Sequence, residues 1–246
     1  MSDEIVFGIH AVNNLLKRAP ERVSEMYVQK GRDDERFRAL FQLASSNGLN
    51  IQEAKKTFLD SLSEGGNHQG VAVKSKQPKP KTENELFKQL DGLTENAFLL
   101  ILDSITDPHN LGACLRSADA AGVHAVIAPK DNAVGLTSTV SKVACGAAET
   151  VPYYQVTNLA RTMKELQGRG IWLYGTAGEA SDSVFATDLR GPIGIVMGAE
   201  GKGLRRLTRE SCDHLINIPM AGDVSSLNVS VAGGICLFEA VRQRSA

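Results

Sequence analysis

Three clusters of glycine, asparagine, serine and charged residues contain the side chains best suited to chemistry. They are DSITDPHNLGACLRSADAAG at 103–122, IVMGAEGKGLRRLTRE at 195–210 and INIPMAGDVSSLNVSVAGGICLFEAV at 216–241. In the first cluster, Pro108 predicts a turn, and Asn110 is suited to cap the helix that follows. Arg116 would lie on the first turns of that helix. So much polarity at one strand exit favours a ligand-binding loop over an ordinary capped helix.

The second cluster is a glycine-rich loop between a strand and a helix. Its order is G-x-x-G-x-G, which differs from the G-x-G-x-x-G of dinucleotide-binding loops. It also contains Glu200, whose carboxylate would repel a pyrophosphate. A carboxylate suits a cation or a hydroxyl donor, and S-adenosylmethionine (SAM) offers both through its ammonium, sulfonium and ribose groups. The charge of this loop therefore argues against NAD or ATP.

Four cations follow this loop at helical spacing. Lys202, Arg205, Arg206 and Arg209 stand at i, i+3, i+4 and i+7, which would put them on one face of a helix. Beside a ligand loop, such a face favours contact with phosphate over simple solvation.

The third cluster combines a loop shaped by Pro219 and Gly222 with a helix start. Ser225 or Ser226 is expected to open the helix, with Asn228 on its first turn. These polar groups exceed what capping needs. A weaker fourth loop, TAGEA at 176–180, follows another strand.

The elements that position these clusters predict a parallel α/β sheet. AFLLILDSI, from residue 97, is a continuous apolar run, as in a strand buried on both faces. Further strands (VHAVIAP, a stretch near 151–156, IWLYGTA, IGIVMGA and HLINIPM) alternate with helices expected at 110–121, 137–146, 157–168, 203–212 and 226–243. In open α/β sheets, ligands bind outside the carboxyl ends of the strands, which is where the clusters fall.

The first part of the chain reads as a small separate α/β domain. Helices are expected from residue 9, at about 34–46 and at 55–63, with strands at MYVQK, NIQEA and GVAVKS. The polar stretch KSKQPKPKTENE contains two prolines and predicts a linker. The predicted division is therefore a domain at 1–75, a linker at 76–95 and a catalytic domain at 96–246.

Composition narrows the class of protein. The net charge of −1 over 246 residues counts mildly against nucleic acid, although a local basic surface matters more. The start MSDEIVFGIHAVNN lacks the basic region of a signal peptide, and no apolar run approaches the roughly 18 residues of a membrane helix. Four scattered cysteines without a CxxC pair predict buried, reduced thiols and no metal site. We expect a cytoplasmic protein outside the membrane.

Together the clusters resemble the three motifs of the SPOUT superfamily of RNA 2′-O-methyltransferases, in its TrmH-like branch. The motifs occur in order as DPHNLGACLRSADAAG, VMGAEGKGL and IPMAGDVSSLNVSVAGGI, with matching spacing over 96–244. One motif would be a weak signal, but three in order are highly specific. The segments GIHAVNNLL, HQGVAV, KVACGAAE and VTNLARTM extend the resemblance over nearly the whole chain, to the 23S rRNA guanosine-2′-O-methyltransferases within this branch.

The resemblance implies a fold and a function. The catalytic domain is expected to contain a C-terminal trefoil knot, which general rules of topology would not propose. SAM is expected to bind bent within the knot loops of a homodimer, with active sites near the subunit interface. Residues 1–75 are expected to bind RNA. The implied reaction is 2′-O-methylation of a guanosine in the peptidyl-transferase centre of 23S rRNA, in the free RNA or a large-subunit precursor, during ribosome maturation.

The resemblance also implies residue roles. Arg116 is implied as the key catalytic residue, with a role as base. Because a guanidinium is effectively always protonated, a second possible role is to hold the target phosphate or to stabilise the developing alkoxide. Asn110, Ser226 and Asn228 would orient the hydroxyl, and Glu200 would shape the SAM loop or bind substrate. The residues implied for SAM are Thr176, Ala177, Gly178, Gly198, Gly201, Ile218, Met220, Ser226 and Leu227, and those expected on RNA are Lys202, Arg205, Arg206 and Arg209.

Other functions remain open at this stage. A methyltransferase of tRNA or of another rRNA site shares the same motifs. A non-catalytic RNA-binding protein of ribosome assembly is a second alternative, against which the intact Asn110, Arg116 and Glu200 argue. A nucleotide-dependent oxidoreductase would need an early G-x-G-x-x-G turn with an acidic residue after it, and the sequence has neither.

Overall fold

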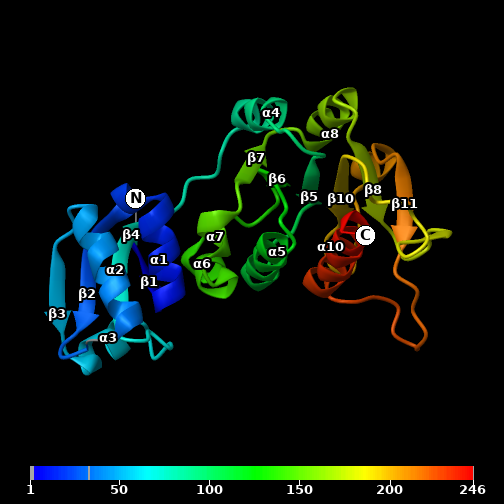
Figure 1. The fold of residues 1–246 in the computed structure, drawn as a ribbon. Helices are drawn as coiled ribbons and strands as arrows, with labels where there is room; N and C mark the ends of the chain where they lie inside the picture. Colours follow the sequence, from blue (N-terminus) through cyan, green and yellow to red (C-terminus); the bar gives the residue numbers. More distant parts are fainter. Residues whose placement is uncertain (1–2, 33, 246) are drawn as a thin grey trace. The chain divides into compact units, whose positions relative to one another are not determined.

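The chain forms two compact units in a computed structural model that describes residues 3–32 and 34–245. The first unit contains residues 1–79 and 136–150, and the second contains residues 80–135 and 151–246. The chain therefore passes between the units three times, after Lys79, Gly135 and Thr150 (Figure 1).

The first unit is built on a four-stranded sheet. In spatial order its strands are β1 (Asp3–Phe7), β4 (Val71–Lys76), β2 (Val23–Gln29) and β3 (Ile51–Ala54). Only the β2–β3 pair is parallel among these strands. Helices α1 (Ile9–Arg18) and α2 (Glu35–Ser46) cover one face, and α3 (Lys56–Leu62) packs on the other through Leu59. A short 3₁₀ helix, η1, spans Pro20–Arg22.

Most elements of this unit were predicted, but β1 was not. It is a sheet-edge strand of five residues that begins with two carboxylates, so its alternation is too short to stand out. Opposite it, α6 (Ser138–Ala144) and α7 (Ala147–Thr150) pack against β1 and α1. The guanidinium of Arg22 joins these pieces, because it binds the carboxylates of Glu4 (3.1 Å) and Glu149.

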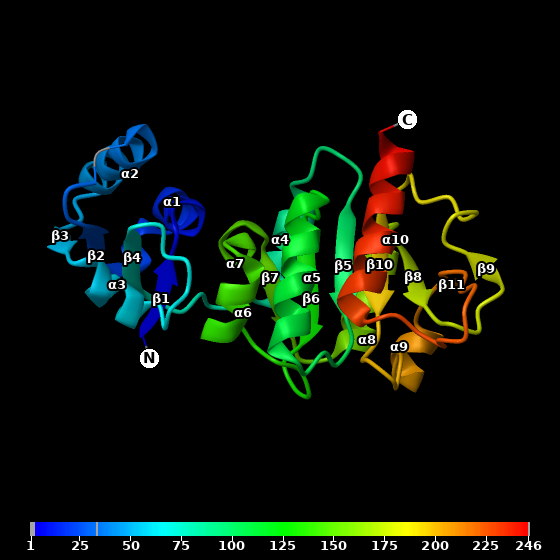
Figure 2. The same cartoon turned by 90° about the horizontal axis from the view of Figure 1, so that it is seen from below.

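The second unit contains a parallel sheet, as the sequence predicted, with seven strands; six of them were expected, and the two-residue strand β9 was not. Its spatial order is β7 (Tyr153–Val156), β6 (Ala125–Pro129), β5 (Phe98–Leu102), β10 (Ile193–Met197), β8 (Trp172–Thr176), β11 (His214–Asn217) and β9 (Asp182–Ser183). Helices α5 (Pro108–Ala120) and α10 (Val229–Arg244) lie side by side on one face of the sheet (Figures 1 and 2). Helices α4 (Glu83–Asp91) and α8 (Leu159–Gly168) cover the other, where their leucines pack against β5 and β8.

Helix α4 lies within the stretch 76–95, for which the sequence suggested a linker. Thr82 and Glu85 form a capping box at its start, and Leu86 and Leu90 are buried in the core. With so few apolar residues in a polar segment, the helical periodicity was too weak to read. Within the stretch, only residues 77–82 and 92–95 lie outside β4 and α4.

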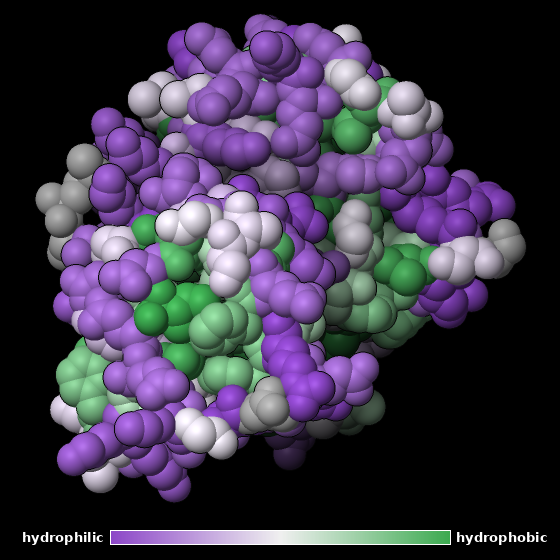
Figure 3. Space-filling view, turned by 60° about the vertical axis from the view of Figure 1, so that its left-hand side comes forward, coloured by the Kyte–Doolittle hydropathy of each residue, from purple (hydrophilic) through white to green (hydrophobic). Residues whose placement is uncertain are grey.

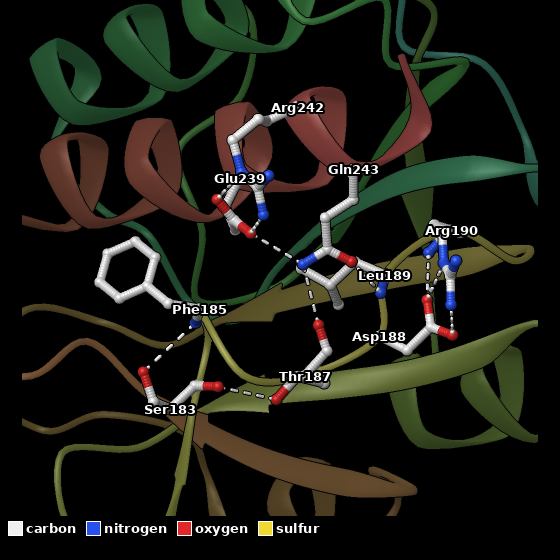
Figure 4. A network of polar contacts seen from close by, with 9 residues as sticks. All are labelled: Ser183, Phe185, Thr187, Asp188, Leu189, Arg190, Glu239, Arg242 and Gln243. Atoms are coloured by element: carbon white, nitrogen blue, oxygen red, sulfur yellow. Dashed lines mark hydrogen bonds and ion pairs between the residues drawn. The ribbon is translucent and has the colours of Figure 1, made fainter. Parts of the chain in front are cut away.

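A polar network fixes the end of α10 to the loop between β9 and β10 (Figure 4). The carboxamide of Gln243 accepts a hydrogen bond from the backbone N–H of Leu189 (2.8 Å) and donates to the carbonyl of Thr187 (2.9 Å). It also donates to Glu239 (2.8 Å), which the guanidinium of Arg242 contacts as well. The neighbouring Arg242, and then Gln243, lower the pKa of Glu239 to about 2. The last turns of the chain are thereby held by side chains as well as by apolar packing.

Most apolar side chains are inside the two units. Every residue of β5, β6 and β10 is buried, which confirms the burial that the apolar run AFLLILDSI predicted for β5. Hydrophilic side chains predominate on the face drawn in Figure 3, where hydrophobic ones show through in patches. In the described part of the chain, no helix combines the length and the apolar character needed to span a membrane.

Candidate active site

The sheet brings the predicted clusters to one edge. Strands β5, β10, β8 and β11 are consecutive neighbours and all parallel, so their carboxyl ends lie together. The first cluster follows β5, the second follows β10 and the third follows β11, while the loop at 176–180 follows β8. The predicted position of the clusters beyond the strand ends is therefore confirmed.

Three side chains, one from each cluster, form a hydrogen-bonded chain at this edge. The amide of Asn110 donates to the carboxylate of Glu200 (Nδ2 to Oε2, 3.2 Å). The amide of Asn228 donates to the carbonyl oxygen of Asn110 (2.8 Å). Asn110 is buried, whereas Glu200 and Asn228 are exposed. Asn110 thus fixes an acidic and an amide side chain at the protein surface.

The capping roles differ from those predicted. Asp107, not Asn110, caps α5, because its carboxylate accepts from the backbone N–H of His109 (3.0 Å) and Pro108 follows as the first helical residue. Likewise, α10 is capped by Asn228 rather than by Ser225 or Ser226. Since Asp107 takes the capping position, the side chain of Asn110 is available to reach across to the other two loops.

An ion pair between an exposed arginine and a buried carboxylate, which the sequence reasoning missed, holds the second loop. The carboxylate of Asp103, which follows β5 directly, is inaccessible to solvent and accepts from the guanidinium of Arg205 (Nε to Oδ1, 2.6 Å). It also accepts from the backbone N–H of Arg205 (2.9 Å) and the hydroxyl of Ser104 (3.2 Å). The available signal was a carboxylate placed directly after a wholly apolar strand.

The prediction of one cationic helical face is wrong. Helix α9 spans only Arg206–Glu210, and Lys202 lies in the preceding turn, where Gly201 and Gly203 have positive φ angles of 74° and 65°. Arg205 turns inward to Asp103, and Arg206 pairs with Glu210 along the helix (3.1 Å). Arg209 binds the carboxylate of Glu179; a backbone hydrogen bond and then Arg209 lower the pKa of Glu179. Three of the four cations therefore already face carboxylates.

The loop after β10 is unusually tight. Ala199 and Gly203 exchange two backbone hydrogen bonds (3.1 and 2.8 Å). A Cβ atom on Gly198 would lie 2.1 Å from the carbonyl carbon of Gly203, so only glycine fits there. At Gly178 a Cβ would lie 4.0 Å from the carbonyl oxygen of Ser225, so the loop after β8 approaches the third cluster. These loops contain the residues expected to hold SAM.

The remaining expected residues are mostly exposed or half-buried. Arg116 is exposed on α5, and Ser226 is exposed in the segment that leads to α10. Ile218 and Leu227 are half-buried, and Met220 is exposed. Thr176 and Ala177 are tied to neighbouring strands, since Thr176 donates to the carbonyl of Val196 (3.2 Å) and the N–H of Ala177 donates to that of Ile216 (3.0 Å).

The thiols are only partly as predicted. Cys114 and Cys236 are buried, Cys212 is partly buried, and Cys145 is exposed. Burial raises the thiol pKa of each of the first three to about 12. The exposure of Cys145 follows from its place at the end of α6, where it adopts a left-handed conformation (φ 53°). Within the described residues, no three His, Cys, Asp or Glu side chains are grouped so that they could hold a metal ion.

Comparison with known families gives two matches that together span most of the chain. Residues 97–238 match the model of the SpoU rRNA Methylase family. Residues 5–81 match a model described as RNA 2′-O ribose methyltransferase substrate binding.

Curated relatives match over the full length. The 23S rRNA (guanosine-2′-O-)-methyltransferase RlmB of Shewanella oneidensis is 60% identical over 241 residues, covering 98% of both chains. RlmB of Escherichia coli is 59% identical over 242 residues, covering 98% of this chain and 99% of the relative.

Solved structures share the fold. The SpoU methyltransferase AviRb from Streptomyces viridochromogenes, crystallised with AdoMet, superposes with a TM-score of 0.79 at 24% identity, covering 99% of this chain and 91% of AviRb. The TrmH/SpoU tRNA modifying enzyme of A. aeolicus superposes with a TM-score of 0.56 at 29% identity, covering 66% of this chain and 84% of that enzyme.

Proposed function

Because the chain belongs to the SpoU rRNA methylase family, we propose that it transfers a methyl group from SAM to the ribose 2′-hydroxyl of a guanosine in 23S rRNA. The resemblance that its three motifs predicted is confirmed by this membership. The observation that carries the choice of substrate is 59–60% identity to RlmB enzymes over nearly the entire chain, which includes the N-terminal unit.

The loops beyond β8, β10 and β11 suit SAM in chemistry and shape. The glycine-tight turn at 198–203 and the irregular segment 218–228 present backbone groups that can pair with an adenine or a ribose. Met220 and Val224 add exposed apolar surface, with 40% and 66% of their areas accessible. Glu200 supplies a negative charge for a cationic ligand. We assign SAM binding to Thr176, Ala177, Gly178, Gly198, Gly201, Ile218, Met220, Ser226 and Leu227.

When bound, SAM supplies a methyl group on a cationic sulfur for in-line attack. The work of this chain is then to hold the ribose hydroxyl in line and to accept its proton, for which the exposed carboxylate of Glu200 is the basic group of the polar set. Such positioning can contribute up to about 7–11 kcal/mol, and proton removal contributes typically about 10²–10⁴-fold. Asn110, Glu200 and Asn228 form a fixed polar set that can orient the hydroxyl.

Arg116 is assigned to the target phosphate or to the developing alkoxide. Its guanidinium stays protonated at neutral pH, which suits it to stabilise negative charge rather than to accept a proton. It lies on α5, six residues beyond the buried Asn110, which is the member of the polar set that this helix carries. Ser226, two residues before Asn228, is assigned to the same hydroxyl.

RNA contacts are assigned to both units. The match of residues 5–81 to a substrate-binding model supports RNA binding by the N-terminal domain. In the catalytic domain, Lys202 and Arg206 are exposed and do not pair with another loop, whereas Arg205 pairs with Asp103 and Arg209 with Glu179. We place the enzyme in the cytoplasm with its rRNA substrate, acting on the peptidyl-transferase centre.

We also propose a C-terminal trefoil knot and a homodimer. Membership of the SpoU rRNA methylase family supports the knot, and the sheet order, in which β10 stands between β5 and β8, is compatible with it. A crystal structure of the full chain, traced for passage of the last segment through an earlier loop, tests it. Analytical ultracentrifugation tests the dimer, since a monomer at micromolar concentration would exclude it.

The function is tested with tritiated SAM, unmethylated 23S rRNA and large-subunit precursors. We expect incorporation of one methyl group per RNA at a guanosine ribose, mapped by mass spectrometry of nuclease fragments. Methylation of tRNA alone, or of a base nitrogen, would overturn the assignment. RNA binding without transfer would favour the non-catalytic alternative.

A further inference from the structure

A cavity of about 340 Å³ lies within the first unit. None of its lining residues belongs to the loops of the candidate active site. It is lined by the end of β1, the start of α1, the loop at 67–69 and helix α6. Its volume falls in the range of about 300–1,000 Å³ that is typical of small-ligand sites. No role in methyl transfer accounts for it.

The chemistry of the lining is mixed and largely uncharged. Phe7 and Ala11 provide apolar and aromatic surface, while Asn67 and Gln69 provide exposed carboxamides. Asn67 has both a donor and an acceptor, whereas the oxygen of Gln69 accepts from the backbone N–H of Ile9 (3.0 Å), so its NH₂ group is the part it offers. The ammonium of Lys142 is paired with the carboxylate of Glu64 (2.6 Å). The one lysine of the lining is thus already paired with a carboxylate, which does not favour a phosphate. A flat heteroaromatic ring fits better, because its face can pack on the apolar surface and its edge can form hydrogen bonds with the carboxamides.

Resting on the proposed RNA methyltransferase function, we propose that this cavity takes one unpaired base of the RNA substrate. Proteins read RNA sequence mainly from unpaired bases that stack on aromatic side chains and pair through their edges. The RNA substrate-binding match covers residues 5–81, which supply all the lining except that from α6 and Cys145. His10, exposed at the rim, adds a second aromatic surface.

The cavity also links RNA recognition to the catalytic part of the chain. Ser141, Lys142 and Cys145 line it, yet the segment that bears them leaves the catalytic sheet after β6 and returns to it at β7. A base bound against this segment would therefore restrain the part of the chain that connects β6 with β7 of the catalytic sheet.

The test is a double-mutant cycle between protein and RNA, using the full-length enzyme and an rRNA hairpin that contains the methylated guanosine. Asn67→Ala removes a carboxamide from the cavity, and Gln42→Ala removes an exposed carboxamide from α2 as the matched control. The hairpin is scanned with abasic sites at its unpaired positions. We expect Asn67→Ala to weaken binding about 3–10-fold and Gln42→Ala to leave it unchanged. At one position, the abasic substitution should cost affinity in the wild type but not in Asn67→Ala.

Cys145 provides an independent footprint. It is exposed on the cavity wall, whereas burial raises the pKa of the other three thiols to about 12, so a maleimide at neutral pH should modify Cys145 first. We expect the hairpin to protect Cys145 at least about fivefold, and the hairpin that is abasic at the identified position to leave it reactive.

Additive effects at every position, or an unprotected Cys145 with RNA bound, would overturn the proposal and indicate another occupant, such as a protein segment. The same preparations are assayed for methyl transfer. If the wild type transfers no methyl group, the proposed function fails regardless of the cavity. If it methylates normally while the cycle is additive, only the cavity proposal fails.

Discussion

Replacement of Arg205 by alanine removes the cation that faces the buried carboxylate of Asp103. The sequence pattern assigns Arg205 to an RNA-binding face, whereas the structure directs its guanidinium into the protein. The two roles predict different losses. A structural role predicts a lower melting temperature, and an RNA-binding role predicts weaker, less salt-dependent binding with unchanged stability.

The size of the loss follows from the burial of the two partners. Removing one partner of a fully buried pair costs about 3–5 kcal/mol. The side chain of Arg205 is 47% exposed, so water can partly solvate Asp103 in the variant. Asp103 also keeps the backbone N–H of residue 205 and the Ser104 hydroxyl. We therefore expect a loss of about 1.5–3 kcal/mol, which corresponds to a fall in melting temperature of about 3–10 °C.

Arg206→Ala is the matched control. Arg206 is 77% exposed and pairs only along its own helix with Glu210, an interaction worth about 0.3–0.5 kcal/mol. Scanning calorimetry of both variants, with and without SAM, measures the difference, and filter binding of rRNA at several salt concentrations measures the phosphate contacts. If Arg205→Ala melts like Arg206→Ala while its salt slope falls by about one, Arg205 contacts RNA and the structural argument is refuted.

Three further predictions concern Arg116, Asn228 of the polar set and Glu4 of the first unit. Arg116→Ala should lower methyl transfer at least about 100-fold and change SAM affinity less than twofold by calorimetry, whereas Arg161→Ala, an exposed arginine on α8, should do neither. Asn228→Ala should cost about 1–2 kcal/mol by losing the cap of α10 and the bond to Asn110; Asn228→Ser should recover the stability but not the transfer rate. Burial raises the pKa of Glu4 from 4.5 to about 7, so the protonated side chain stabilises the folded state. This contribution is complete below about pH 4.5 and is lost as the pH rises through about 7. Urea unfolding should therefore show the wild type losing about 1–3 kcal/mol relative to Glu4→Gln between about pH 5 and pH 8; parallel curves would contradict it.

The sequence predicted the features that follow from local patterns of apolar and polar residues. Apolar runs located the central strands, and the polar clusters after them located the site, because the carboxyl ends of parallel strands meet at one edge. Helix α4 escaped because few of its residues are apolar, and β1 escaped because it is a short edge strand.

Partners distant in sequence could not be predicted. Nothing in the spacing pairs Asp103 with Arg205, 102 positions later, because that contact depends on how the loop after β10 turns over β5. The same turn explains the wrong cationic face. A helical projection of Lys202 and Arg209 assumes a continuous helix, but the chain turns at Gly201 and Gly203 before α9 begins. The spacing of residues predicts a shared helical face only where the backbone is a continuous helix.

The three chain crossings between the units have a consequence for biosynthesis. Residues 1–79 leave the ribosome well before residues 136–150, yet α6 and α7 complete the packing of their unit against α1 and β1. Domains usually fold in order of synthesis, from the N-terminus. Here the apolar core of the first unit forms from residues before β4 ends, whereas Glu149, the second partner of Arg22, follows only after β5 and β6 have been made. The cavity wall formed by Ser141, Lys142 and Cys145 is therefore added only after β5 and β6 have been synthesised, so the proposed base site is completed later than the sheet that carries most of it.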